Sequence, residues 1–226
     1  MSNSELVGTL NDQAAALLRS RIFSGGLTPG TRILEADLAD ELGLSRGTLR
    51  SALQQLGFEG LVVQKRFRST FVATLSSREA FEIYTLRNCL ESMAAQLAAR
   101  NIDKAGMAAI AAAVDVMEQA AGRNDVDGVR EADFLFHQCV ARLSGHSKLQ
   151  EHYKIIEYQT RLYLSQISEL DYDLSVVLGV HVKLAKAIRR GDEATAFRLA
   201  QDHNTADGER MVRNLRNQES VKAPAM

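Results

Sequence analysis

The sequence predicts a mainly α-helical protein with two domains of unequal size, and three observations support this prediction. Pro occurs only twice and Trp is absent, whereas Ala and Leu are abundant, a composition that favours helices over sheets. The chain of 226 residues is longer than a single helical core usually requires. Apolar residues recur at helical spacing along most of the chain, and strand-like alternation is confined to a short stretch before residue 76.

Three helices are expected in the first 60 residues. The first begins near Thr9, and its apolar spacing ends at Gly25. A short second helix ends at Gly43, and Ser45 then caps a third helix, which ends at Gly60. Apolar residues line one side of this third helix and leave a basic, polar side for solvent. A short helix, a glycine turn and a second helix with a basic outer face form the pattern of a helix-turn-helix.

A β-hairpin is expected directly after these helices. Residues 61–64 and 70–73 read as two strands, and the basic segment 65–69 reads as the turn between them. Such a hairpin beside a helix-turn-helix is the wing of a winged helix-turn-helix. The sequence therefore predicts a winged helix-turn-helix domain over residues 1–75.

The rest of the chain is expected to form an all-α six-helix bundle over residues 76–216. Ser76 and Glu79 have the spacing of a capping box, so the first of its helices starts near residue 77. Breaks in the apolar spacing separate the six expected helices, 77–100, 103–122, 125–144, 147–169, 172–190 and 192–215. The polar segment 217–226 is expected to be a disordered tail.

Nothing in the sequence indicates export or a membrane. No run of eighteen apolar residues occurs, and residues 1–10 have neither a basic leader nor an apolar core. Cys89 and Cys139 lie among apolar neighbours in helical patterns and are expected to be buried free thiols rather than a disulfide. We therefore expect a cytoplasmic protein.

The formal net charge of −1 conceals a basic region. Residues 45–76 contain five basic residues and one acidic residue, which gives this segment a net charge of +4. Residues 77–226 contain 19 basic and 21 acidic residues, a net charge of −2. Affinity for phosphates depends on local charge, so the total charge does not argue against a nucleic-acid partner.

The basic region lies on the elements that read DNA in a winged helix-turn-helix. A helix fits the major groove, where Arg can donate two hydrogen bonds to guanine and Ser or Thr can reach phosphates. For the arginines of the helix alone, a solvated helix face is an equal alternative, but the adjacent basic turn favours double-stranded DNA. The expected DNA-binding residues are Ser45, Arg46, Thr48, Arg50, Lys65, Arg66 and Arg68.

A second set of polar residues lies on apolar helix faces of the C-terminal part. Asp133 and His137 are four residues apart and share an inward face, and His181 and His203 have apolar neighbours in later helices. Taken singly, each histidine fits an ordinary hydrogen-bonded core residue. Together they would leave several buried polar groups unmet unless they converge on one partner. A divalent metal satisfies all four, and this donor set suits Zn²⁺ first, with Ni²⁺, Fe²⁺ or Mn²⁺ as alternatives.

Arg87 also lies among apolar residues at helical spacing, with Glu91 one turn further on. One interpretation is an intrahelical ion pair between these two side chains. The other is that Arg87 turns towards a carboxylate ligand, which a guanidinium can bind through two hydrogen bonds. The residues by themselves leave both interpretations open.

These segments together resemble the GntR family of bacterial regulators, in the branch with a helical ligand-binding domain named FCD. In the N-terminal part the resemblance lies in residues 22–30 (IFSGGLTPG), 38–53 (LADELGLSRGTLRSAL), 59–61 and 70–73 (TFVA). In the C-terminal part it lies in Arg87 with Leu90-Glu91, Asp133 with His137, His181 with Ala187-Ile188 and Gly191-Asp192, and His203.

The resemblance implies a homodimer that represses transcription from a short palindromic operator until a small organic acid binds. It also implies a metal held by the four residues Asp133, His137, His181 and His203. Six C-terminal helices resemble the vanillate-regulator subgroup. Two departures concern DNA: Phe67 and Ser69 replace both glycines of the usual Gly-Arg-Gly wing, and Gly47-Thr48 stands where Ala-Pro or Thr-Pro is usual.

The sequence leaves two alternatives to a ligand-responsive regulator. A metal-dependent hydrolase is suggested by a buried histidine-rich site that could activate water, but no adjacent His-Asp pair or placed general base is evident. A pure metal sensor would change its DNA affinity with the metal alone. We therefore expect no enzyme activity and a small carboxylate as effector.

Overall fold

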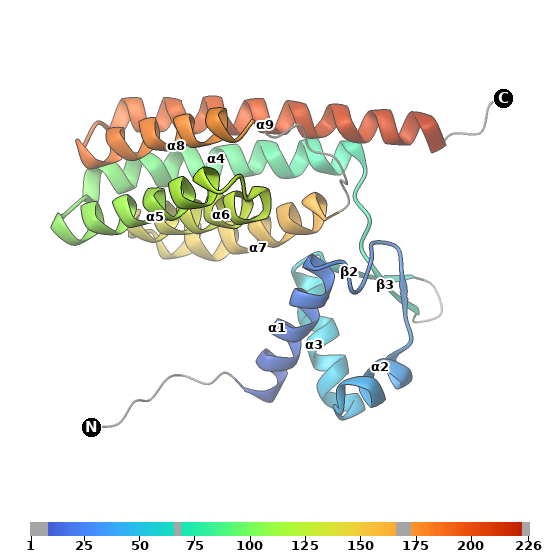
Figure 1. Cartoon of the computed structure of the whole chain (residues 1–226). Helices are drawn as coiled ribbons and strands as arrows, with labels where there is room; N and C mark the ends of the chain where they lie inside the picture. The colour runs from blue at the N-terminus through green and yellow to red at the C-terminus, as the bar shows by residue number, and fades with distance from the viewer. Residues whose placement is uncertain (1–8, 66–68, 166–172, 223–226) are drawn as a thin grey trace, which may run out of the picture. The chain divides into compact units, whose positions relative to one another are not determined.

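The computed structural model describes residues 9–65, 69–165 and 173–222, and helices dominate these residues (Figure 1). The mainly α-helical fold class predicted from the sequence is therefore confirmed. Contacts divide the chain into two compact units. One consists of residues 1–75 and 158–168, and the other consists of residues 76–157 and 169–226. The grouping of residues 158–168 with the N-terminal unit is a tertiary feature without a sequence signal.

The N-terminal unit contains the helices and strands of a winged helix-turn-helix. Its elements are α1 (Leu10–Phe23), β1 (Arg32–Ile33), α2 (Glu35–Leu42), α3 (Arg46–Phe58), β2 (Val62–Lys65) and β3 (Ser69–Val72). The strands form one antiparallel sheet in the order β1-β3-β2. The sequence did not predict β1, because a two-residue strand is too short to show alternation.

Local residue chemistry explains the helix boundaries of this unit. Thr9 and Asp12 form the capping box that starts α1. Gly43 adopts the left-handed conformation with a φ of 62°, which ends α2 and turns the chain towards α3. The buried stripe of α3 packs against α1 in a core that includes Leu18, Leu49 and Leu56. This core holds α3 with its polar face outward.

Six helices follow residue 76 within the described residues, as predicted, although the last part of the fourth of them groups with the N-terminal unit. They are α4 (Ser77–Asn101), α5 (Lys104–Gly122), α6 (Val126–Leu143), α7 (Ser147–Leu164), α8 (Leu174–Arg189) and α9 (Glu193–Lys222). The capping box of Ser76 and Glu79 starts α4 as expected. Helices α4 and α9 run side by side over most of their length (Figure 1).

The expectation of a disordered tail from residue 217 is wrong for residues 217–222, which continue α9. Glu219 explains the extension, because its carboxylate accepts hydrogen bonds from the backbone N–H and the hydroxyl of Ser77, both at 2.7 Å. These bonds satisfy a free backbone donor in the first turn of α4. Residues 223–226 lie outside the described part of the chain.

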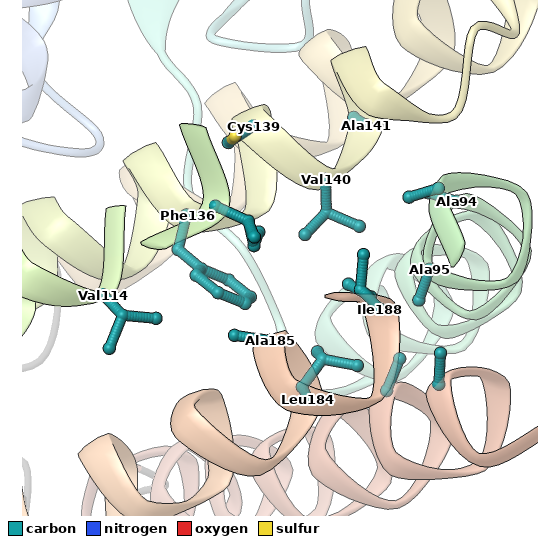
Figure 2. Packing of buried hydrophobic residues seen from close by; sticks show 14 of the residues in the cluster. Ala94, Ala95, Val114, Phe136, Cys139, Val140, Ala141, Leu184, Ala185 and Ile188 are labelled. Carbon is teal, nitrogen blue, oxygen red and sulfur yellow. The ribbon is translucent and has the colours of Figure 1, made fainter. Parts of the chain in front are cut away.

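The core of the bundle is built around α6 and α8, as Figure 2 shows. Phe136 and Val140 of α6 face Leu184 and Ile188 of α8 there, and small alanines of α4 border the same space. The ring of Phe136 is fully buried and meets the ring of His181 edge-on, with centroids 4.9 Å apart. The same packing that forms this core therefore positions histidines beside it.

Cys139 is buried as expected, but Cys89 is exposed. Cys89 lies on the same side of α4 as Leu86 and Met93, which are also exposed. No other helix among the described residues covers this apolar stripe. The prediction from helical periodicity that Cys89 is buried is therefore wrong. Both thiols are free. Within the described residues, no helix combines the length and hydropathy needed to cross a membrane.

Candidate functional site

The structure brings Asp133, His137, His181 and His203 into one buried cluster. Asp133 and His137 come from α6, His181 comes from α8 and His203 from α9. One potential ligand atom from each residue lies within 4.8 Å of those from the other three. The four side chains therefore meet at one point although the sequence separates them by up to 70 positions.

The closest contacts within this cluster involve His181. Its Nε2 atom lies 2.9 Å from Oδ1 of Asp133 and 3.2 Å from Nε2 of His137. Nε2 of His137 lies 3.8 Å from the same Asp133 oxygen. The ring of His203 stacks on that of His137, with centroids 5.4 Å apart and an interplanar angle of 3°.

The outer nitrogens of two rings have acceptors that assign the hydrogen positions. Nδ1 of His181 lies 2.8 Å from the backbone carbonyl of Val177, and Nδ1 of His137 lies 2.9 Å from Oε2 of Glu91. Because these acceptors require an N–H at Nδ1, a neutral ring has its lone pair at Nε2. Two lone pairs and the Asp133 carboxylate therefore point at one another, and a cation between them removes the repulsion.

Charge around the cluster favours a cation in the same way. Burial raises the pKa of Asp133, but the charges of His181 and His137 outweigh burial and hold that pKa well below its usual range. Burial lowers the pKa of His181, yet the Asp133 carboxylate outweighs it and the pKa is raised. A proton on His181 therefore occupies the position that a metal ion would take, and binding of that ion would displace the proton.

His203 supplies the test of whether a metal fits. Its Nε2 atom is buried and has no hydrogen-bond partner within the described residues, since Oδ2 of Asp207 is 3.6 Å away. Burial lowers the pKa of His203 to about 4, despite the Asp207 carboxylate. The ring is thus neutral at pH 7, the form that binds metals. A buried ring nitrogen without a partner is costly, and a divalent metal satisfies it when that nitrogen carries the lone pair.

The donor set of three imidazoles and one carboxylate therefore fits a divalent transition metal such as Zn²⁺. Four protein ligands leave further positions for water or a ligand in a five- or six-coordinate metal. The two remaining histidines, His146 and His152, are exposed and belong to no such cluster.

Arg87 is 3% exposed and forms the intrahelical ion pair that the sequence suggested, with its Nε atom 2.6 Å from Oε1 of Glu91. The pair does not use the whole guanidinium, because the buried Nη2 has no hydrogen-bond partner among the described residues. The buried hydroxyl of Tyr153 likewise has no hydrogen-bond partner among the described residues. Both groups can donate to an oxygen of a bound ligand.

The predicted DNA-binding residues of α3 lie at its start and on its outer face. Ser45 is the N-cap, and its hydroxyl accepts from the N–H of Thr48 at 3.0 Å. Arg46 is exposed, and the side chain of Arg50 is 72% exposed. Arg50 is nevertheless engaged, since its Nε lies 2.8 Å from Oε2 of Glu35 at the start of α2. Sequence reasoning missed this partner, because the pair joins two helices.

The wing is described only in part. Lys65 at the end of β2 is exposed, and its ammonium lies 5.0 Å from the centroid of the Phe71 ring in β3. Arg66 and Arg68 lie outside the described residues, as does Phe67. Arg32 and Gln64, which the sequence did not single out, line a groove together with Arg50. They add polar groups next to the basic face of α3.

Two sequence profiles match the chain and together cover most of it. The profile described as bacterial regulatory proteins of the gntR family matches residues 10–72, and that of the FCD domain matches residues 82–206. The chain belongs to the GntR family and carries an FCD domain. This GntR protein is therefore a transcription regulator and not a metal-dependent hydrolase, because the family consists of regulators.

Similar proteins cover nearly the whole GntR chain. A probable D-xylose utilization operon transcriptional repressor of Paenarthrobacter nicotinovorans is 25% identical over 198 residues, 88% of this chain and 87% of that protein. The gluconate operon transcriptional repressor of Bacillus licheniformis is 27% identical over 80% of this chain and 76% of its own. The structure of a GntR regulator from Rhodococcus sp. RHA1 superposes with a TM-score of 0.77 at 24% identity, covering 91% of this chain and 98% of that one.

Two residues of the FCD domain were missed or only partly understood from the sequence. Glu91 was noted as a partner of Arg87, but its contact with His137 was not foreseen. Asn204 was not singled out, although its Nδ2 donates to Oε2 of Glu91 at 2.9 Å and its buried Oδ1 has no hydrogen-bond partner among the residues that the structure describes. Both contacts join separate helices, and helical spacing carries no information about them.

Proposed function

We propose that this GntR protein is a cytoplasmic repressor that binds a palindromic operator as a homodimer and is released by a small carboxylate bound at a metal centre in its FCD domain. One observation carries the proposal: Asp133, His137, His181 and His203 converge while the buried Nε2 of His203 has no partner within the described residues. Such a donor set is costly without a cation and suits one well.

Zn²⁺ is the metal that the donor set favours first, and Ni²⁺, Fe²⁺ and Mn²⁺ suit it as well. Bound by Asp133 and the three histidines, the metal supplies a positive charge and free coordination positions for oxygen ligands. The protein holds its ligands rigid, because all four side chains are buried on packed helices. This rigidity favours a resident metal over a transient one.

A small carboxylate is the effector class that the surrounding groups favour. Arg87 offers a buried N–H without a partner in the described residues, and Tyr153 offers a buried hydroxyl. A guanidinium and a phenol next to a metal match the oxygens of a carboxylate that carries further hydroxyl groups. Of the compounds named for the two relatives, gluconate is a carboxylate and D-xylose is not, so the groups at the site are the stronger support for this effector class.

The DNA part of the proposal rests on α3 and β2. Ser45, Arg46, Thr48 and Arg50 lie at the start and outer face of α3, and Lys65 is exposed at the end of β2. One recognition helix reads too few bases for useful specificity, so two copies on a palindrome are expected. The effector acts on DNA binding through its different affinity for two arrangements of that dimer.

The test uses the purified full-length protein and starts from its metal content by elemental analysis. A random double-stranded DNA pool, selected on the protein, supplies the operator probe for fluorescence titrations. Repression relieved by a carboxylate predicts weaker DNA binding when gluconate and related sugar acids are titrated into the zinc-loaded protein. Affinity that changes with the metal alone, with no response to any carboxylate, would instead identify a metal sensor.

The dimer is tested separately by light scattering on the protein with and without the selected DNA. Twice the monomer mass of 24.9 kDa is expected for the free protein. A monomer both free and on DNA would contradict the proposed mode of binding.

A further inference from the structure

Glu91 is a buried carboxylate that contacts three helices at once. It lies in α4 and is 3% exposed. Its Oε1 accepts from Nε of Arg87 in the same helix, whereas its Oε2 accepts from Nδ1 of His137 in α6 and from Nδ2 of Asn204 in α9. The two oxygens therefore bind different partners, and the ion pair with Arg87 involves only Oε1.

The contact with His137 sets the state of a metal ligand. A carboxylate oxygen 2.9 Å from Nδ1 requires the ring hydrogen to sit on Nδ1, which leaves Nε2 as the free lone pair. It is this Nε2 that lies among the other potential ligand atoms, 3.2 Å from His181 Nε2. The hydrogen bond also fixes the rotation of the imidazole about its Cβ–Cγ bond.

His181 has its own orienting group, the backbone carbonyl of Val177. A backbone acceptor comes with the helix and depends on no particular side chain. The orientation of His137 depends on the side chain of Glu91, and the sequence spaces the two 46 positions apart. Glu91 is thus the substitutable group that decides whether His137 presents a lone pair.

We propose that Glu91 is a positioning residue, which holds His137 for the metal and at the same time holds Arg87 with its Nη2 free for the carboxylate effector. This inference rests on the proposed metal centre. A carboxylate that accepts a hydrogen bond from a metal-binding histidine raises the basicity of that ligand. Loss of such a carboxylate typically weakens metal binding 10- to 100-fold.

The double role of Glu91 has a consequence for regulation. An effector oxygen bound to Nη2 of Arg87 would interact with the same guanidinium whose Nε donates to Oε1 of Glu91. The other oxygen of Glu91, Oε2, accepts from the metal ligand His137. Two bonds on one carboxylate thus connect the two binding events. Metal and effector should therefore each raise the affinity for the other, and by the same factor.

The decisive variant is Glu91→Gln, which keeps the size of the side chain but leaves one oxygen acceptor in place of two. The matched control is Glu157→Gln, because Glu157 is a buried carboxylate of the same domain that accepts from Gln138 and does not belong to the four-residue cluster. Zn²⁺ affinity is measured on the metal-free full-length proteins by competition with a chromophoric chelator. We expect zinc affinity to fall 10- to 100-fold in Glu91→Gln and to change less than threefold in Glu157→Gln.

A merely structural role for Glu91 is separated by two further measurements. The melting temperature in excess chelator reports stability without metal, and the rise on adding zinc reports metal binding. NMR of the metal-free protein with ¹⁵N-labelled histidine reports the His137 tautomer directly, with Nδ1–H expected in the wild type and a mixture in Glu91→Gln.

The outcomes separate the two ideas. Wild-type protein that takes up no stoichiometric zinc overturns the proposed metal centre, and this inference with it. Wild-type protein that binds zinc, with Glu91→Gln binding within threefold and keeping the Nδ1–H tautomer, overturns the inference and leaves the metal centre standing. Weak zinc binding by Glu91→Gln with a changed tautomer, in a protein that still unfolds cooperatively without metal, is the supporting result; loss of the buried ion pair with Arg87 lowers the metal-free melting temperature in either case.

Discussion

The Nε2 atoms of His137 and His181 lie 3.2 Å apart in the bundle core, and the acceptors at both Nδ1 atoms leave those two nitrogens without hydrogens in the neutral rings. Two lone pairs at this distance repel each other, and the Asp133 carboxylate beside them adds negative charge. A metal ion bound at this point would remove the repulsion.

Changing His181 and His203 together to Ala should abolish stoichiometric metal binding, because it removes two of the four ligands. Wild-type protein should lose stability on chelation, by about 2.7 kcal/mol at free metal a hundred times its dissociation constant, and the double variant should not respond. Elemental analysis and melting with and without chelator measure both effects. A control with His146 and His152 changed to Ala should keep the wild-type metal content and the wild-type response to chelator, since both residues are exposed and lie outside the cluster. Full metal content in the first variant would contradict the site.

Arg46→Ala and Arg50→Ala should each weaken operator binding by about 1–3 kcal/mol if each residue contacts a base. The reason is their exposure on the outer face of α3, with Arg50 held by Glu35 in the free protein. Fluorescence anisotropy at low salt measures the change. Arg100→Ala is the control, because Arg100 is an exposed arginine of the C-terminal bundle paired with Glu193. Unchanged affinity of the Arg46 and Arg50 double variant would rule out this interface.

Arg87→Lys should weaken the response to a carboxylate effector about tenfold or more while zinc uptake persists. Lysine keeps the positive charge beside Glu91 but lacks the planar fork that binds a carboxylate through two hydrogen bonds. Titration of gluconate into the protein–DNA complex gives the effector response, and elemental analysis gives the metal content. An effector response equal to that of the wild type would show that Arg87 serves only the ion pair.

Gly208→Ala should destabilise the bundle by about 1–3 kcal/mol, because its new Cβ would lie 2.9 Å from Cβ of Tyr84 where α9 meets α4. Gly179→Ala is the opposite case, since a Cβ at this position of α8 meets no atom within 4 Å. Alanine there should stabilise the helix by up to about 1 kcal/mol. Urea unfolding of both variants measures the two changes. Equal effects of the two substitutions would contradict the close approach of α4 and α9.

Much of the fold follows from local patterns in the sequence. The starts of α1 and α4 follow from the capping boxes that begin with Thr9 and Ser76, because a cap involves residues only three positions apart. The turn at Gly43 and the buried stripe of α3 follow from residue type and helical spacing in the same way. The environment of Cys89 did not follow, because spacing gives the apolar side of a helix but not whether a partner covers it.

For the candidate site, too, local spacing predicted some features and only the tertiary structure showed the others. The sequence by itself determined that Asp133 and His137 share one face of α6, because residues four apart in a helix are neighbours, and that His181 and His203 lie on apolar faces. Only the tertiary structure decided that the four ligand atoms come within 4.8 Å, that Glu91 orients His137 and that Glu35 holds Arg50. These contacts join different helices, and their distances depend on how the helices cross and on the side chains packed between them.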